Sequence, residues 1–86
     1  MYFVYILQSL LDKKFYIGFT HDIKSRFLQH QKGGVKSTKN RRPLDLVYYE
    51  AFKREEDARR QEIFYKTSQG RRILRKRIQP IIGGVA

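Results

Sequence analysis

Two short segments near the start of the chain, residues 2–8 and 14–20, are rich in aromatic and β-branched side chains. Segments of that composition favour β-strands, and the five residues between them leave room for a turn. The chain is therefore predicted to begin with an antiparallel hairpin. This hairpin constrains the rest of the fold, because every later element must cover one of its two faces.

The loop decides which residues of the hairpin face one another. A four-residue loop centred between residues 10 and 11 places Tyr5 opposite Tyr16 and Phe3 opposite Gly18, with both phenols on one face of the sheet. A different loop length would move one phenol, and a change of one residue in that centre would put Tyr16 out of register. Strand tyrosines also commonly serve as amphipathic core residues, and that alternative stays open for Tyr5 and Tyr16.

A helix is predicted to follow the second strand. Thr20 can cap its N-terminus, and Asp22 lies in the first turn, where the helix dipole favours a carboxylate. Arg26 and His30 are four residues apart, a spacing that puts them on the same flank of the helix. From this flank both side chains can reach across to the sheet.

The remaining pattern predicts one strand and two helices. The segments are a basic, glycine-containing loop over residues 31–42, a strand over 44–52, a helix over 54–67 and a helix over 68–79 that Pro80 ends. Strict alternation places Leu44, Leu46, Tyr48 and Phe52 on one side of that strand. The apolar residues 81–86 either pack on the sheet or fray, and both alternatives stay open.

The order strand, strand, helix, strand, helix, helix favours an α/β fold with a small three-stranded, mostly antiparallel sheet flanked by helices. A length of 86 residues fits one such domain, spanning residues 1–86. No repeat and no linker-like segment divides the chain. We therefore predict a single domain without a second core.

The composition excludes several classes of site. The chain has no cysteine and two histidines, so we expect no disulfide, no thiolate metal site and no zinc cage. It has no glycine-rich phosphate loop, and no small-molecule cofactor is predicted. The longest apolar run is far shorter than a membrane span, and the N-terminus lacks the pattern of a signal peptide. We expect a soluble, cytoplasmic protein without a membrane partner.

A net charge of +11 makes a polyanion the expected partner, with nucleic acid the first choice. The positive residues gather before Pro43 and again beyond residue 62, where no acidic residue follows. We expect phosphate contacts from Lys36, Lys39, Arg41, Arg42, Arg72, Arg75 and Lys76. Such contacts weaken steeply with salt and read little sequence. A basic surface can instead serve solubility alone, although such surfaces usually mix both signs of charge.

An ordered set of residues resembles the GIY-YIG endonuclease domain, a family named after two short strand motifs. The second motif is intact as Tyr16-Ile17-Gly18, whereas the first reads Phe3-Val4-Tyr5 and keeps only its tyrosine. Arg26, His30 and Glu62 follow in the family's order. The resemblance covers residues 3–78. It is strongest to the small stand-alone members and to the structure-selective junction-cleaving nucleases, and it implies the same element order, ββαβαα.

This resemblance implies a metal-dependent endonuclease that hydrolyses DNA phosphodiester bonds, with selectivity for DNA structure and a place in repair or recombination. Glu62 would be the sole protein ligand of one Mg²⁺ or Mn²⁺. Arg26 would hold the scissile phosphate and neutralise the charge that builds on it. Tyr5 would be the base that activates the attacking water, with Tyr16 orienting that water or sharing the task. A phenol needs a lowered pKa for this role, which Arg26 and the metal would supply.

The resemblance also gives His30 the role of hydrogen-bonding a tyrosine or a phosphate, and gives Gly18 that of letting backbone or nucleic acid approach closely. Ordinary alternatives stay open for three of these residues. His30 can be an interior histidine, Gly18 can relieve packing against Phe3, and Glu62 can form a helical ion pair with Lys66. One departure stands out. Many family nucleases carry an asparagine downstream of the metal-binding glutamate, whereas no asparagine follows Glu62.

Two other classes of function stay open. A non-catalytic, basic nucleic-acid-binding module would need the same charge, but it has no reason to combine two tyrosines, an arginine and a glutamate. An inert member of the family would use its basic face for a protein partner. Phosphate contacts are indifferent to the 2′-hydroxyl, so both DNA and RNA remain candidates. A domain of this size covers few base pairs, so sequence specificity would require a dimer or an added domain.

Overall fold

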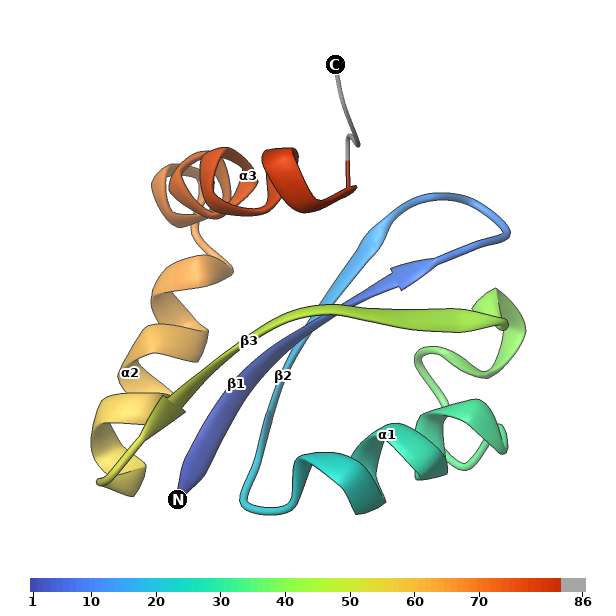
Figure 1. The fold of residues 1–86 in the computed structure, drawn as a ribbon, viewed down its shortest axis with the longest axis horizontal. Helices are drawn as coiled ribbons and strands as arrows, with labels where there is room; N and C mark the ends of the chain where they lie inside the picture. Colours follow the sequence, from blue (N-terminus) through green and yellow to red (C-terminus); the bar gives the residue numbers. More distant parts are fainter. Residues whose placement is uncertain (83–86) are drawn as a thin grey trace.

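The computed structural model describes residues 1–82 as a three-stranded sheet with three α-helices (Figure 1). The elements are β1 (Tyr2–Ser9), β2 (Phe15–Thr20), α1 (Ile23–Gln31), the short 3-10 helix η1 (Lys39–Arg41), β3 (Leu44–Phe52), α2 (Glu55–Tyr65) and α3 (Ser68–Ile82). Both strand pairings are antiparallel. The predicted fold class and the order ββαβαα are therefore confirmed. Over this part of the chain, none of the helices combines the length and apolar character that crossing a bilayer requires.

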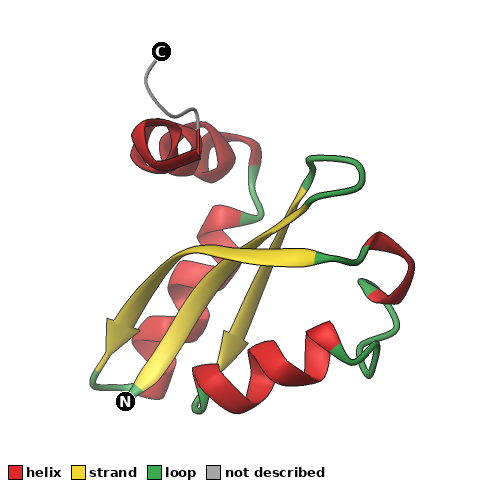
Figure 2. Ribbon diagram, turned by 45° about the vertical axis from the view of Figure 1, so that its right-hand side comes forward, coloured by secondary structure: helices red, strands yellow, loops and turns green. Residues whose placement is uncertain are grey.

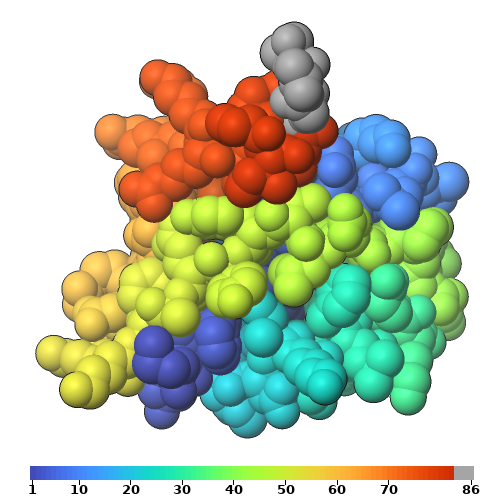
Figure 3. Space-filling view, in the orientation of Figure 1, coloured from blue at the N-terminus to red at the C-terminus, as the bar shows by residue number. Residues whose placement is uncertain are grey.

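The central strand of the sheet contributes side chains to two hydrophobic clusters of one domain, one cluster on each face. The strand order is β2-β1-β3, and Figure 2 shows α1 on one face and α2 on the other. Because side chains alternate along a strand, Val4 and Ile6 of β1 pack with α2 and α3, whereas Tyr5 and Leu7 pack with α1. In the space-filling view, β3 forms a band between α3 and α1 (Figure 3).

The hairpin register differs from the predicted one by two residues. Tyr5 lies opposite Gly18, and Leu7 lies opposite Tyr16. The predicted direct pairings of Tyr5 with Tyr16 and of Phe3 with Gly18 are therefore wrong. A shift of two residues nevertheless preserves the face on which each side chain lies. The two phenols remain on one face, as diagonal rather than direct neighbours.

The turn between β1 and β2 explains the shift in register. The Ser9 hydroxyl oxygen accepts hydrogen bonds from the backbone N–H groups of Leu11 and Asp12, at 3.1 and 3.2 Å. The Asp12 carboxylate accepts one from the N–H of Lys14 at 2.9 Å, and Lys13 adopts a left-handed conformation with φ of 64°. These local side-chain bonds centre the turn between residues 11 and 12, one residue later than predicted, and this displacement shifts the pairing by two residues.

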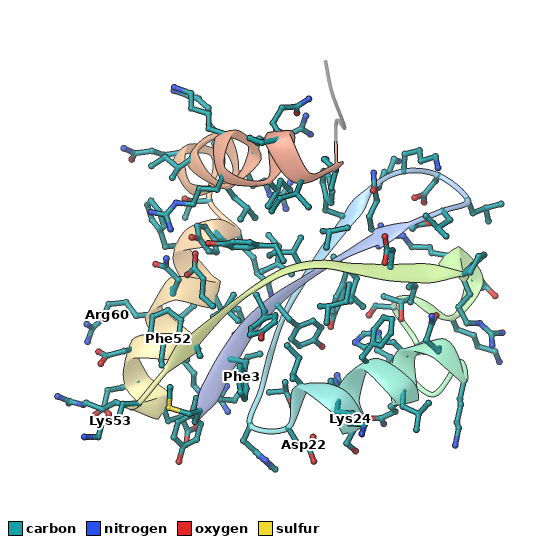
Figure 4. All side chains as sticks on the ribbon, in the orientation of Figure 1. Phe3, Asp22, Lys24, Phe52, Lys53 and Arg60 are labelled. Atoms are coloured by element: carbon teal, nitrogen blue, oxygen red, sulfur yellow. The ribbon has the colours of Figure 1, made fainter. Side chains whose placement is uncertain are left out.

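A bulge in the pairing of β3 with β1 moves its side chains from one face of the sheet to the other. The register shifts midway along β1, and the extra residue on β3 reverses the alternation beyond it. Leu44 and Leu46 consequently pack on the α1 face, whereas Tyr48 and Phe52 pack on the face of α2 and α3. Figure 4 shows Phe52 beside α2. The prediction that these four residues share one side is therefore wrong, because it assumed unbroken alternation.

Two helix ends also differ from the prediction. The N-cap of α1 is Asp22, not Thr20, because the Asp22 carboxylate accepts a hydrogen bond from the N–H of Ser25 at 3.0 Å (Figure 4). α3 continues past Pro80 to Ile82. Proline was expected to end this helix. It removes one N–H donor, but the helix continues and Ile82 packs against the core. Residues 83–86 of the apolar segment lie outside the described residues.

Glu50, on β3, joins the sheet to α2 and α3. Its carboxylate accepts hydrogen bonds from Tyr48 at 2.7 Å, from Gln61 at 2.9 Å, from Arg77 at 3.0 Å and from Tyr65. Burial disfavours the charged form, but these hydrogen bonds outweigh it and hold the Glu50 pKa below its ordinary value. This network therefore ties both helices to the sheet on the face away from α1.

Replacement of Glu50 should test that network. Glu50→Ala leaves the hydroxyls of Tyr48 and of the fully buried Tyr65 without their acceptor, so we expect a loss of about 2–4 kcal/mol in the free energy of unfolding. Asp45→Ala, at an exposed position of the same strand, is the control and should cost less than about 0.5 kcal/mol. Denaturant unfolding measures both. Equal losses would show that the network does not hold the helices.

Candidate active site

Four of the five predicted catalytic residues come together on the α1 face of the sheet. Tyr5 lies on β1, Tyr16 on β2, and Arg26 and His30 on α1. The ring centroids of Tyr5 and Tyr16 are 6.2 Å apart, and the centroid of His30 lies 5.7 Å from the former and 5.0 Å from the latter. Arg26 and His30, four residues apart on one flank of α1, thus both reach the sheet. We refer to these four residues as the tyrosine cluster.

Gly18 makes room for the cluster, because the Tyr5 phenol lies over its backbone. A Cβ atom at position 18 would overlap the Cζ atom and the hydroxyl oxygen of Tyr5. Tyr5 itself is only 1% exposed. Gly18 therefore relieves packing against Tyr5 and not, as the alternative had it, against Phe3, which lies opposite Thr20. Phe3 lies on the α1 side of β1 (Figure 4), and its ring packs edge-on against Tyr49 with centroids 5.8 Å apart.

The Tyr5 hydroxyl is part of a directed chain of hydrogen bonds. Arg26 Nε donates to the Tyr5 oxygen over 3.2 Å, and His30 Nε2 lies 2.8 Å from the same oxygen. On its other side, His30 Nδ1 lies 2.7 Å from the Thr38 hydroxyl, which donates to the carbonyl of Val35 over 3.5 Å. Arginine can only donate, so the single Tyr5 proton points to His30 Nε2. This bonding pattern assigns the His30 proton to Nδ1, toward Thr38.

Burial keeps both Tyr5 and His30 uncharged at neutral pH. Burial raises the pKa of Tyr5 to about 12, and the hydrogen bond from Arg26, which favours the phenolate, offsets this only in part. Burial and, more weakly, the charge of Arg26 lower the pKa of His30 to about 4. The pair is therefore a phenol that donates to a neutral imidazole. Arg26 lowers the Tyr5 pKa as expected, but burial outweighs this effect.

Arg26 and Tyr16 form the part of the cluster that solvent reaches. Both are half-buried, whereas Tyr5 and His30 are enclosed. Arg26 also donates from Nη1 to the Gln29 side chain at 3.0 Å, and no carboxylate among residues 1–82 forms an ion pair with it. Neutral partners therefore hold Arg26 in place and leave its positive charge uncompensated. A guanidinium that is both held in place and uncompensated suits the binding of a phosphate.

Glu62 lies apart from the cluster, on α2. Its carboxylate is 18% exposed and accepts a hydrogen bond from Lys66 at 3.0 Å, so the helical ion pair of the ordinary alternative is formed. Lys66 lines a cavity of about 570 Å³ that Tyr16 also lines. The consecutive residues Phe15, Tyr16 and Ile17 all line it, and β2 is an edge strand. The cavity therefore opens over the free edge of β2, where the two faces of the sheet meet.

The donor groups fit a metal ion that nucleic acid helps to bind. Across residues 1–82, no group of three His, Cys, Asp or Glu side chains lies close enough together to hold an ion. Glu62 is a single, half-buried carboxylate. Mg²⁺ keeps several waters and commonly binds one or two carboxylates together with phosphate oxygens. The chain thus suits an ion shared with a phosphate, not an ion enclosed by protein ligands.

The predicted phosphate-binding residues divide into two groups. Arg41 pairs with Asp12 at 3.3 Å, and Arg42 donates to the backbone carbonyls of Lys39 and Gln31, so both arginines hold the loop in place. The other predicted cations are exposed, and no ion pair or side-chain hydrogen bond with residues 1–82 engages them. They are Lys36 and Lys39 in the loop, and Arg72, Arg75 and Lys76 on α3.

The sequence does not reveal two further sets of residues. Thr38, which completes the hydrogen-bond chain, is fully buried within a segment whose composition predicts an exposed loop. Lys13, Lys14, Lys66 and Arg71 line the cavity at β2. Lys66 and Arg71 belong to the basic run after residue 62, but only the turn geometry brings the two hairpin lysines to the same place.

Lowering the pH from about 6.5 to about 4 should destabilise the fold through His30. Its pKa is about 6.5 in the unfolded chain and about 4 in the folded one. In this window the unfolded state binds the extra proton, so stability falls as the pH drops. Carboxylates with lowered pKa values, such as Glu50, act only below about pH 5, where the same groups in the unfolded chain begin to bind protons. His30→Gln should remove the fall between about pH 7.5 and 5 in denaturant unfolding. An equal fall in both proteins would attribute it to another group.

Comparison with known proteins identifies the family. The GIY-YIG catalytic domain matches residues 1–77. The chain is 43% identical over 68 residues to a UPF0213 protein of Limosilactobacillus reuteri, covering 76% of this chain and 70% of the relative. It is 37% identical over 67 residues to one of Bacillus pumilus, covering 77% and 67%. The solution NMR structure of a UPF0213 protein from Bacillus halodurans matches with a TM-score of 0.54 and 36% identity, covering 86% of this chain and 82% of that one. The chain belongs to the GIY-YIG catalytic domain family, a family of nucleases.

Proposed function

We propose that the protein is an endonuclease that uses Mg²⁺ or Mn²⁺ to hydrolyse phosphodiester bonds of DNA. The tyrosine cluster is the observation that supports this most. A binding protein needs positive charge, but it has no need of a buried histidine that holds a phenol against a guanidinium. Membership of a nuclease family supports the same activity.

Arg26 is the residue proposed to hold the scissile phosphate. Tyr5 and Gln29 fix two of its nitrogen atoms, Nε and Nη1, and it has five N–H donors in all. Because these contacts hold the guanidinium before DNA binds, little reorganisation is needed as negative charge builds on the phosphate oxygens. Its role is therefore electrostatic stabilisation of the transition state.

Tyr16 is a better candidate than Tyr5 for the phenol that contacts the attacking water. Tyr5 is enclosed and has a pKa of about 12, whereas Tyr16 lines the cavity. In the phenolate form, Tyr16 takes a proton from the water as the water oxygen bonds to phosphorus and the P–O bond to the leaving strand breaks. The leaving oxygen takes a proton from solvent. Tyr5 and His30 then position Arg26 instead of exchanging protons with water.

Glu62 is proposed as the protein ligand of the metal ion. A bound divalent ion supplies positive charge at the phosphate and at the leaving oxygen. To serve this role, the Glu62 carboxylate must give up its hydrogen bond with Lys66, an exposed side chain at the C-cap of α2. The Lys66 ammonium group, released from Glu62, can then contact a DNA phosphate instead.

Branched or flapped DNA is the proposed substrate class, with repair or recombination as the setting. Lysine and arginine are the commonest exposed side chains on the described part of the chain, and they contact phosphates. Phosphate contacts read the shape of a nucleic acid and not its base sequence. Selectivity for structure follows more readily from such a surface than selectivity for sequence.

A non-catalytic DNA-binding module is the second candidate. Two observations favour it: the Glu62–Lys66 ion pair, which gives the glutamate a structural role, and the absence of an asparagine after Glu62. This candidate keeps the salt-dependent binding that a charge of +11 predicts. It differs in having no turnover with any divalent ion.

Two matched substitutions on α2 separate these candidates. Glu62→Gln should lower metal-dependent cleavage of flapped DNA by at least about 100-fold while DNA binding in chelator is retained, because it removes the proposed metal ligand. Glu55→Gln breaks an equivalent i, i+4 ion pair, with Arg59 at 2.9 Å, and should leave cleavage unchanged. Cleavage of labelled duplex, flapped and four-way DNA with Mg²⁺, Mn²⁺ or chelator measures both. Equal activity of the two variants would rule out a metal-binding role for Glu62.

Tyrosine substitutions test the division of roles between the two phenols. Tyr16→Phe should lower kcat by at least about 100-fold with little change in stability, because its hydroxyl takes part in neither hydrogen bond of Tyr5. Tyr5→Phe should instead destabilise the fold by about 1–3 kcal/mol, since His30 and Arg26 lose a buried partner. Kinetics and denaturant unfolding report the two effects separately. Full activity of a folded Tyr16→Phe variant would contradict the assignment of the base to Tyr16.

A further inference from the structure

The cavity at the free edge of β2 extends well beyond the tyrosine cluster. It lies between β2, the hairpin turn and α3, and Figures 1 and 2 show the turn and α3 at the same end of the sheet. Its positive side chains come from three parts of the chain. Lys13 and Lys14 belong to the turn, Lys66 follows α2, and Arg71 and Arg75 lie on α3. No acidic residue of the part that the structure describes lines the cavity.

Most of this positive charge is not compensated within the protein. Lys66 pairs with Glu62. The side chains of the other four cations form no ion pair and no hydrogen bond with any residue of the described part, 1–82. Like charges that converge on one cavity repel one another, and a bound anion relieves that repulsion. The cavity is therefore complementary to phosphate groups.

The floor of the cavity is apolar. It consists of Phe15 and Ile17 from β2 and Leu74 and Ile78 from α3. A duplex presents phosphates and sugars along its outer surface, and stacking covers the faces of its bases. An unpaired strand exposes base faces as well as phosphates. A rim of cations over an apolar floor thus matches the two parts of an unpaired strand better than it matches a duplex.

The size and position of the cavity agree with this occupant. A volume of about 570 Å³ lies within the range of about 300–1,000 Å³ typical of small-ligand sites, a size that suits unstacked nucleotides. Tyr16 lines the cavity, and its ring lies 6.2 Å from that of Tyr5. A strand in the cavity therefore continues directly toward the tyrosine cluster.

We propose that this cavity binds an unpaired DNA strand and leads it to the tyrosine cluster. The identity of the polymer as DNA rests on the proposed function, and the proposal narrows the substrate class to DNA in which an unpaired strand leaves a duplex. The preference then comes from the shape of the cavity, not from base-specific contacts. The cations hold the phosphates of the strand, and the floor covers its bases.

One helix offers a matched pair of variants. Arg71 and Arg75 line the cavity, whereas Arg72 and Lys76 are exposed on the same helix but do not line it. The double variants Arg71→Gln/Arg75→Gln and Arg72→Gln/Lys76→Gln remove equal charge from α3. Fluorescence anisotropy in chelator, over a series of salt concentrations, measures the binding of the full chain to oligothymidylate and to a duplex of equal length. Circular dichroism checks that each variant is folded.

We expect the wild type to bind the single strand more tightly than the duplex. The cavity variant should lose this preference, and the slope of log K against log salt for oligothymidylate should fall by roughly 1.4, which is about 0.7 for each of two lost contacts. The control variant should keep the preference, because Arg72 and Lys76 are predicted phosphate contacts outside the cavity, and its slope should fall equally for oligothymidylate and for duplex. Equal losses of single-strand affinity in the two variants, or no preference for the single strand in the wild type, would overturn the proposal.

Failure of this proposal is distinguishable from failure of the proposed nuclease activity, because binding is measured in chelator without cleavage. If the cavity variant behaves like its control while Glu62→Gln abolishes cleavage, the cavity proposal alone is wrong. If only the cavity variant loses single-strand binding and no cleavage occurs with any metal, the cavity is a strand-binding site of a non-catalytic protein. That result would support the cavity proposal and reject the nuclease.

Discussion

The packing of the Tyr5 phenol over the bare backbone of Gly18 determines the arrangement of one half of the molecule. A hydroxyl enclosed at 1% exposure must find hydrogen-bond partners, because an unpaired polar group in an apolar core is costly. Both partners, Arg26 and His30, come from α1. His30 in turn binds Thr38, which fixes the segment after the helix. One side chain of β1 thereby joins both strands of the hairpin, α1 and the following loop.

The two faces of the sheet carry different parts of the proposed function, and the edge strand β2 connects them. The tyrosine cluster lies on the α1 face, whereas Glu62 and the α3 cations lie on the other side. Because side chains alternate, a continuous surface between the faces exists only around a free strand edge. In many proteins such an edge invites pairing with another chain. Here lysines and arginines surround the cavity beside it, and their repulsion discourages that pairing.

The sequence predicts the elements of this fold well, but it predicts their pairing poorly. Strand composition, helix periodicity and charge determine the order ββαβαα, since they depend on residues close together in the chain. Register depends on the turn geometry that the side chains of Ser9 and Asp12 create. It also depends on the bulge in β3, which the composition of the strand does not predict. The phenols nevertheless lie on one face because the error was two residues, an even number. The burial of Thr38 could not be predicted from the sequence either, because it depends on tertiary contacts.

The ion pair between Glu62 and Lys66 links the two proposals. In the protein alone the two charges neutralise each other at 3.0 Å, and one carboxylate is too few to hold Mg²⁺ firmly. A phosphate of a strand in the cavity competes with Glu62 for Lys66, because Lys66 lines that cavity. The same strand brings phosphate oxygens that can share the ion with the released carboxylate. Bound DNA would then raise the affinity for the metal ion. Bound metal would raise the affinity for DNA by the same factor, because coupling between two binding sites is reciprocal. Such coupling would keep the hydrolytic site incomplete until DNA is bound.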